Sequence, residues 1–228
     1  MSRQNSINAL ILRTEKAITP LKGDYEAALR AKNISEDIKI DIKNIFENLR
    51  SVLDYLAHDI SDYLADSQPP RLYFPILQSI VEFEKVMAKD YSGVKANHPQ
   101  VYAELEKAQP FNDPWLGQFN SLNNNNKHQD LVEQTRTESR RVSVTSPTGG
   151  GGVSWGPGVT FGSGVSVMGV PIDPRTQLPV PNNQVKTEII TWVDFKFKDN
   201  ALSVIPFIEL SIERVRQLHE QISKHIDI

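Results

Sequence analysis

Two long helices are predicted at the start of the chain, because apolar residues recur there every three or four positions. The first covers residues 4–31, and Pro20 is the residue able to disturb it. The second covers residues 35–65 and begins at Ser35, which two acidic residues follow, as is typical of a helix N-terminus. The second helix has the clearest apolar stripe of the sequence: Ile38, Ile42, Ile45, Phe46, Leu49, Val52, Leu53, Leu56, Ile60 and Leu64.

Four further helices follow the same periodicity. An extended segment at 72–76 comes first, and Pro99, Pro114 and Pro206 are each expected near the start of a helix. The predicted helices are 78–90, 98–108, 113–132 and 206–226. The last of them has an apolar stripe and no helical neighbour in sequence, so we expect it to pack on the earlier helices.

Residues 138–200 differ in character from the rest of the chain. Nine of the 12 glycines lie between Gly149 and Gly169. Apolar and polar residues alternate in three stretches, which predicts β-strands at 141–145, 153–168 and 186–198. The predicted fold class is therefore α+β: a mostly α-helical bundle with a Gly-rich β-sheet or hairpin insertion before the final helix. The chain would form one domain, in which residues 1–137 are the helical bundle, residues 138–200 are the β insertion, and residues 201–228 are the C-terminal helix that returns to the bundle.

The glycine cluster is predicted to be a hairpin loop. It lacks the Gly-Lys-Ser/Thr ending of a phosphate-binding loop, and it lies among strand patterns instead of between a strand and a helix. Trp155 and Phe161 in this segment are expected to pack on their own sheet, with contact to a partner as the alternative.

Composition narrows the classes of function. The formal charge is −3, with 25 basic and 28 acidic residues, so nucleic-acid binding requires a local basic patch and no DNA partner is expected. The chain has no cysteine, which excludes thiolate ligands and thiol nucleophiles and fits a reducing cytoplasm. No apolar run of about 18 residues occurs, and charges interrupt the first apolar run too early for a signal peptide. We therefore expect a cytoplasmic protein without a membrane partner.

The run Leu122-Asn-Asn-Asn-Asn-Lys-His128 is the most unusual feature of the sequence. At about 100° per residue, Asn123 falls in the apolar stripe of its helix, whereas Asn124 and His128 share a flank. A buried amide without partners costs about 1–3 kcal/mol, so specific partners are expected. The run is therefore either a structural lock or a site, to which Lys127 would contribute a cation.

A second set of polar residues recurs every four positions on the second helix. Arg50, Asp54 and His58 form a ladder that projects almost opposite the apolar stripe. A solvated face is the default interpretation. A dimer or a second layer of helices would instead make these residues interface or cleft groups.

No metal, cofactor or serine-hydrolase motif is found. His98, His219 and His225 lack the spacing of a metal-ligand set, and no Gly-x-Ser-x-Gly sequence occurs. His98 before Pro99 and His225 near a helix C-terminus have sufficient structural explanations. We expect neither a metal site nor a cofactor.

Several segments together resemble a known superfamily. They are Leu49-Arg-Ser-Val-Leu-Asp-Tyr-Leu-Ala57, Phe74-Pro-Ile76, Gln109-Pro-Phe111 and Leu122-Asn-x3-Lys-His128. They are similar to uncharacterised bacterial helical proteins with HEPN-like cores (higher eukaryotes and prokaryotes nucleotide-binding), over about residues 35–132 and the last helix. The resemblance implies a helical bundle, a homodimer, and metal-independent endoribonuclease activity in a toxin or phage-defence system. The active motif of the family is Arg, four to six residues, then His.

The chain departs from that motif at one position. Asn123 stands five residues before His128, where the family has arginine. Cleavage through a ribose 2′-hydroxyl requires a proton-transfer group, which His128 can supply, and a cation, for which Lys127 or Arg50 would substitute. Two hypotheses follow: an RNA or nucleotide cleft lined by His128, Asn123, Asn124 and Lys127, or a non-catalytic partner-binding or oligomerisation module.

Overall fold

The computed structural model divides the chain into two compact units, Met1–Thr135 with Lys196–Ile228, and Arg136–Phe195. We call these the helical unit and the β unit. The structure describes residues 3–31, 33–66, 68–128, 134–147, 151–156, 158–182, 184–197 and 200–226.

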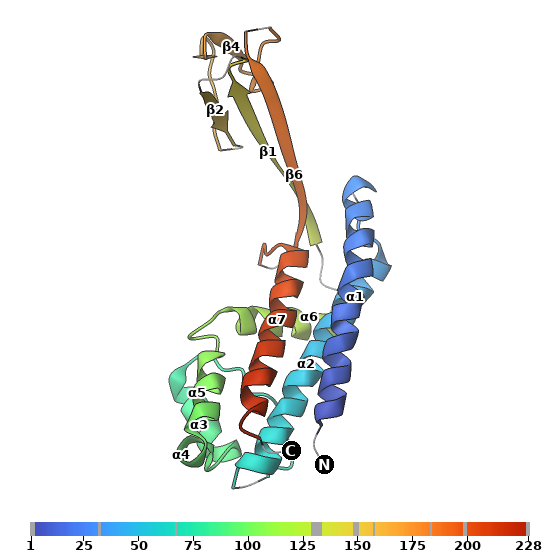
Figure 1. The fold of residues 1–228 in the computed structure, drawn as a ribbon, viewed down its shortest axis with the longest axis vertical. Helices are drawn as coiled ribbons and strands as arrows, with labels where there is room; N and C mark the ends of the chain where they lie inside the picture. Colours follow the sequence, from blue (N-terminus) through green and yellow to red (C-terminus); the bar gives the residue numbers. More distant parts are fainter. Residues whose placement is uncertain are drawn as a thin grey trace. The chain divides into compact units, whose positions relative to one another are not determined.

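Three long helices form one side of the helical unit. They are α1 (Gln4–Ala31), α2 (Glu36–Leu64) and α7 (Val204–Ser223). Ser35 caps α2, because its hydroxyl accepts a hydrogen bond of 3.3 Å from the backbone N–H of Ile38. Helix α1 continues through Pro20. Figure 1 shows the three helices side by side, and α2 packs on both α1 and α7, as the apolar stripes predict.

Helix α7 begins two residues earlier than predicted. Ser203 is its N-cap residue, so Pro206 lies inside the first turn, where a missing N–H breaks no intrahelical bond. The helix ends at Ser223, three residues before the predicted end at 226.

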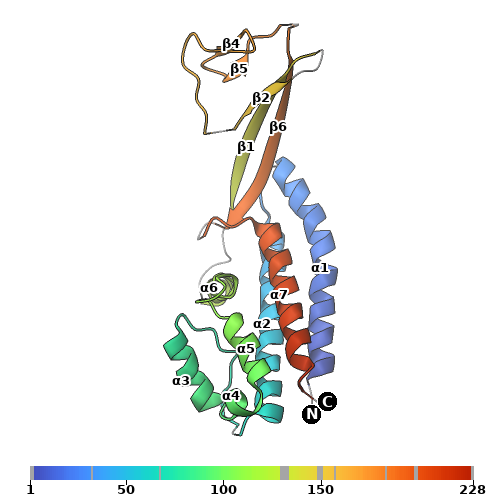
Figure 2. The ribbon, with the colours of Figure 1, turned by 60° about the vertical axis from the view of Figure 1, so that its left-hand side comes forward.

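Four helices form the other side of the helical unit. They are α3 (Ile80–Asp90), α4 (Val94–Asn97), α5 (Pro99–Lys107) and α6 (Trp115–His128). In Figure 2, α3, α4 and α5 lie on one side of α2 and α7, and α1 lies on the other. The short helix α4 was not predicted; it follows Gly93, whose φ of 85° only glycine adopts easily. The predicted residues 129–132 of α6 lie outside the described residues.

A buried amide joins two parts of this side. The side chain of Gln109 is fully buried, and its Oε1 accepts from the N–H of Leu77 at 3.0 Å. Its Nε2 donates to the carbonyl of Pro75 at 3.0 Å and to that of Leu105 at 2.9 Å. These bonds fix the extended segment before α3 against the end of α5, because each satisfies a buried polar group.

The β unit contains two small antiparallel sheets. The first has the order β2-β1-β6, and the second has the order β3-β4-β5. The strands are β1 (Gln134–Thr145), β2 (Gly152–Trp155), β3 (Ser166–Val167), β4 (Val170–Asp173), β5 (Leu178–Pro179) and β6 (Lys186–Phe197). Strand β1 begins four residues before the predicted strand region. Val142 pairs with Trp155 in the first sheet, and Val167 pairs with Val170 across a two-residue turn with positive φ at both positions.

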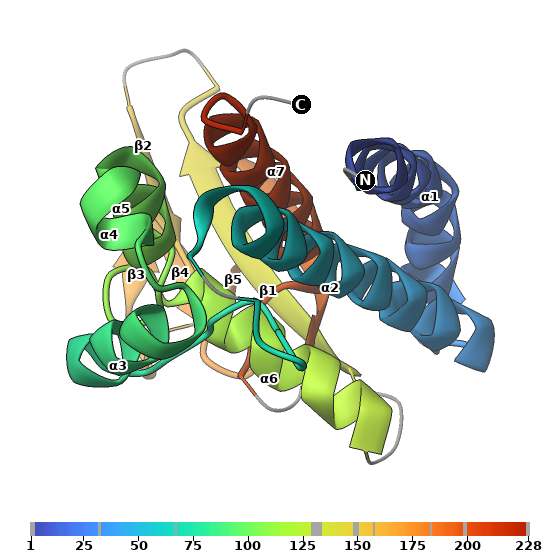
Figure 3. The same ribbon diagram turned by 90° about the horizontal axis from the view of Figure 1, so that it is seen from below.

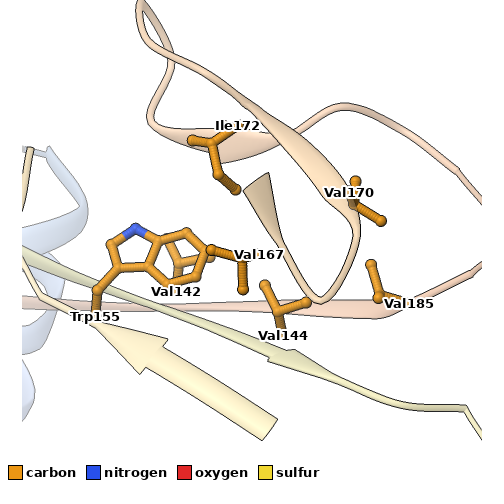
Figure 4. Packing of buried hydrophobic residues seen from close by; sticks show 7 residues of the cluster. All are labelled: Val142, Val144, Trp155, Val167, Val170, Ile172 and Val185. Carbon is orange, nitrogen blue, oxygen red and sulfur yellow. The ribbon is translucent and has the colours of Figure 1, made fainter. Parts of the chain in front are cut away.

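The predicted strand at 153–168 is two short strands. Residues 156–165 contain four glycines, and no strand is assigned there among the described positions, because glycine loses more entropy in a strand than other residues. The unit still has its own apolar core, drawn in Figure 4: Val142, Val144, Trp155, Val167, Val170, Ile172 and Val185. The rings of Trp155 and Phe161 meet edge to face at 5.0 Å, as expected for aromatic residues that pack on their own sheet.

The structure confirms an α+β fold that is mostly helical, with small antiparallel sheets. Among the described helices, none combines the length and apolar composition needed to cross a lipid bilayer.

Candidate functional site

Apolar packing sets the position of α6, the helix that carries the Asn-rich run. Leu116, Phe119 and Leu122 are buried. The ring of Phe119 meets that of Phe46 on α2 edge to face, with centroids 5.6 Å apart. Figure 3 shows α6 running along the lower side of α2. This contact directs one face of α6 toward the helical core.

Asn123 lies on that buried face, as its place in the apolar stripe predicts. Its side chain is 1% exposed, and neither Oδ1 nor Nδ2 has a hydrogen-bond partner within the described part of the chain. The expected partners of this amide are therefore not found there. An amide in this state costs about 1–3 kcal/mol relative to a satisfied one.

The other predicted residues of the run differ in placement. Asn124 is exposed. The backbone of α6 is described as far as His128, but the side chains of Lys127 and His128 lie outside the described residues.

Arg50 on α2 makes two kinds of contact. Its guanidinium is paired with Asp54, with Nε to Oδ2 at 3.1 Å and Nη2 to Oδ1 at 3.0 Å. The third nitrogen, Nη1, donates to Oδ1 of Asn120 on α6 at 3.2 Å. The Arg50 side chain is 13% exposed, so this is a largely buried link between the two helices.

Asp54 extends the link to the segment before α3. Its Oδ1 also accepts from the backbone N–H of Phe74 at 3.0 Å. Nearby, the hydroxyl of buried Tyr91 donates to the carbonyl of Tyr73 at 3.0 Å. Burial raises the pKa of Tyr91, and the charges of Asp54 and Asp90 raise it further. Helix α6 and the segment before α3 thus cover part of the face of α2 that carries Arg50 and Asp54. This part of the face is not solvated, and the alternative of a second layer of helices applies to it.

The structure does not bring all of the predicted residues together. His58 is half-buried, one helical turn beyond Asp54. The bond from Arg50 reaches α6 at Asn120, and eight residues of helix separate Asn120 from His128, which is about 12 Å along the axis. The contact of Arg50 with α6 is therefore about two helical turns from the backbone of His128.

A groove between α1 and α7 lies outside the predicted set. It encloses about 720 Å³, and Gln4, Ile11, Leu12, Arg216 and His219 are among the residues that line it. His219 is 4% exposed, and its Nε2 lies 3.1 Å from Oε1 of Gln4. Burial lowers the pKa of His219, although the charges of Glu220 and Asp59 partly oppose this effect.

Two important polar residues were missed from the sequence. Asn120 precedes Asn124 by four positions, and this spacing was a signal that it shares a flank with the Asn-rich run. Gln109 had no comparable signal, because its three partners depend on how a loop and a helix end meet.

Among the described residues, no group of three or more His, Cys, Asp or Glu side chains is arranged to hold a metal ion. Comparison of the chain with protein-family models, with curated proteins and with solved structures found no match in any of the three.

Proposed function

We propose that this chain is a HEPN-like cytoplasmic protein that binds single-stranded RNA at the C-terminal half of α6 and cleaves it without a metal ion. In this proposal His128 transfers protons, Lys127 supplies the cation, exposed Asn124 adds a polar group to the surface, and buried Asn123 lies beneath them. The resemblance further suggests a homodimer in a toxin or phage-defence system.

One observation carries the proposal: the buried amide of Asn123, which has no partner among the described groups. Gln109 illustrates a completed structural lock, because its carbonyl oxygen and amide nitrogen together make three hydrogen bonds. Asn123 does not match that description. An unsatisfied amide five residues before a histidine supports a polar site at this end of α6.

The chemistry needs few groups. The imidazole of His128 would accept the proton of a ribose 2′-hydroxyl while that oxygen attacks the adjacent phosphorus. The 5′-oxygen then leaves and takes a proton from water, and a 2′,3′-cyclic phosphate remains on the other fragment. A cation must stabilise the charge that develops on the phosphoryl oxygens. Of the two cations suggested by the sequence, Arg50 is paired with Asp54, so this role is assigned to Lys127.

The test is cleavage of single-stranded RNA in the presence of EDTA. We expect His128→Ala to abolish cleavage, and the matched change His225→Ala, at an exposed histidine, to leave it intact. Asn123→Arg restores the arginine of the family and should raise activity if the position is accessible to substrate. An unfolded Asn123→Arg protein would instead support a structural role, because a buried unpaired charge costs several kcal/mol.

A second candidate function is a non-catalytic partner-binding or oligomerisation module. It is favoured by the β unit, which has a separate apolar core and exposes Val153, Met168 and Val180. A folded wild-type protein and a folded Asn123→Arg variant that cleave none of a varied set of RNAs would favour this function. Light scattering then distinguishes a partner-binding module from an oligomerisation module, because a monomer mass at tens of micromolar excludes oligomerisation.

A further inference from the structure

We infer that Asn120 and Arg50 are positioning residues of the proposed RNA site, because their hydrogen bond fixes the rotation of α6 about its own axis. This inference rests on the proposed function. It adds a residue that the family motif does not contain, and it gives Arg50 a role other than contact with RNA.

The bond is well placed for this role. Arg50 is itself held in one orientation, because Asp54 accepts a hydrogen bond from Nε and forms an ion pair with Nη2. Asp54 in turn accepts from the backbone of Phe74. The guanidinium that reaches Asn120 is therefore attached to α2 and to the segment before α3, and it has little freedom to follow a rotation of α6.

The apolar contacts of α6 are less directional than this hydrogen bond. The neighbouring contact of Phe119 with Phe46 is an aromatic contact, and such contacts tolerate a range of angles. A hydrogen bond from a rigid fork is directional, and its strength falls steeply with misalignment. The polar bond at Asn120 therefore selects one rotation among those that the apolar face permits.

The rotation of α6 matters to the proposed site through helical spacing. Residues 120, 124 and 128 are spaced four apart, and residue 127 lies seven beyond residue 120. At about 100° per residue these positions share one side of the helix. Fixing Asn120 against Arg50 therefore fixes the rotation of the α6 backbone at positions 124, 127 and 128.

Direct binding of RNA phosphate by Arg50 is the competing explanation. Three guanidinium contacts are already made within the chain, the side chain is 13% exposed, and Asp54 neutralises its charge. Each of these reduces its attraction for a phosphate. A positioning role agrees with all three.

The experiment compares two substitutions of Asn120. Asp retains the oxygen that accepts from Arg50, whereas Leu removes it. We expect Asn120→Leu to lower kcat for RNA cleavage by about tenfold or more with little change in KM, since a misplacement near 1 Å can cost about 100-fold. Asn120→Asp should restore kcat. Ser121→Leu, at the exposed neighbouring position, is the matched control and should leave kcat unchanged.

A second readout separates this inference from the proposed function. The imidazole resonances of His128 should shift in Asn120→Leu and return in Asn120→Asp, whether or not the protein cleaves RNA. A wild type without cleavage but with these shifts defeats the proposed function and leaves the positioning role standing. Unchanged resonances and unchanged kcat in Asn120→Leu overturn the inference. If Asn120→Leu fails to fold, Arg50→Lys replaces it, because lysine keeps the charge but lacks the fork, and the same outcomes apply.

Discussion

Arg50 and Asn120 are separated by 70 positions in the sequence, and a hydrogen bond of 3.2 Å joins their side chains across the contact between α2 and α6. The bond connects the ladder on α2 to the helix of the Asn-rich run. Asn123, one turn farther along α6, is buried and has no such partner among the described residues. Among the described side chains of α6, a satisfied amide and an unsatisfied one thus lie one turn apart, next to the proposed site.

The central leucines of α2 should carry much of the stability of the helical unit. Leu53 and Leu56 are at most 1% exposed, so Leu53→Ala or Leu56→Ala should each lower the free energy of unfolding by about 2–5 kcal/mol. Leu12→Ala is the control, because Leu12 is 50% exposed and its loss should matter little. Urea denaturation measures all three, and equal midpoints for the wild type and the α2 variants would contradict the assigned core.

Two glycines should respond in opposite directions to alanine. Gly93 has a φ of 85°, and an added Cβ would overlap the carboxylate of Asp66, so Gly93→Ala should destabilise by about 1–2 kcal/mol. Gly23 lies inside α1 with open space at its Cβ position, so Gly23→Ala should stabilise by about 0.5–1 kcal/mol. Thermal unfolding of both variants tests this pair, and a shift of the same sign in both would show the assignment to be wrong.

Gln109 should behave as a structural lock. Gln109→Ala leaves the buried N–H of Leu77 and the carbonyl of Pro75 without their partner, which should cost at least about 1–3 kcal/mol. Gln100→Ala on the exposed side of α5 removes the same side chain without such bonds and is the control. Amide hydrogen exchange at Leu77 is the direct measurement, and unchanged protection in Gln109→Ala would refute the lock.

Stability should fall in mild acid because of His219. Burial keeps its pKa in the folded state below the ordinary value of 6.5, so the unfolded chain binds the proton more readily. The contribution is therefore fully present above about pH 6.5, declines as the pH falls from there to the folded-state pKa, and changes no further below it. The slope from one such group is at most about 1.4 kcal/mol per pH unit.

The pH effect is isolated by comparison with His219→Gln, which cannot be protonated. Urea midpoints at pH 7.5 and pH 5.5 should move farther apart in the wild type than in this variant. Equal differences in the two proteins would show that His219 titrates alike in the folded and unfolded states.

Local sequence patterns determined the long elements. Helix α2 can be predicted without knowing what packs on it, because its apolar spacing and its cap at Ser35 are both features of neighbouring residues. The same holds for α1 and for the order of helices around a glycine-rich β segment. Periodicity alone did not predict two short features. Helix α4 follows the positive φ of Gly93, and the alternating pattern at 153–168 is interrupted by glycines that do not favour a strand.

The sequence by itself also predicted that Asn123 faces the core, since burial on a helix follows from its 3.6-residue period. Only the tertiary structure decided which amides are satisfied. Gln109 is bonded to Leu77, Asn120 to Arg50, and Asn123 to none of the described groups. A hydrogen bond depends on distances of about 3 Å between groups far apart in the chain, and no local pattern of residues fixes such distances.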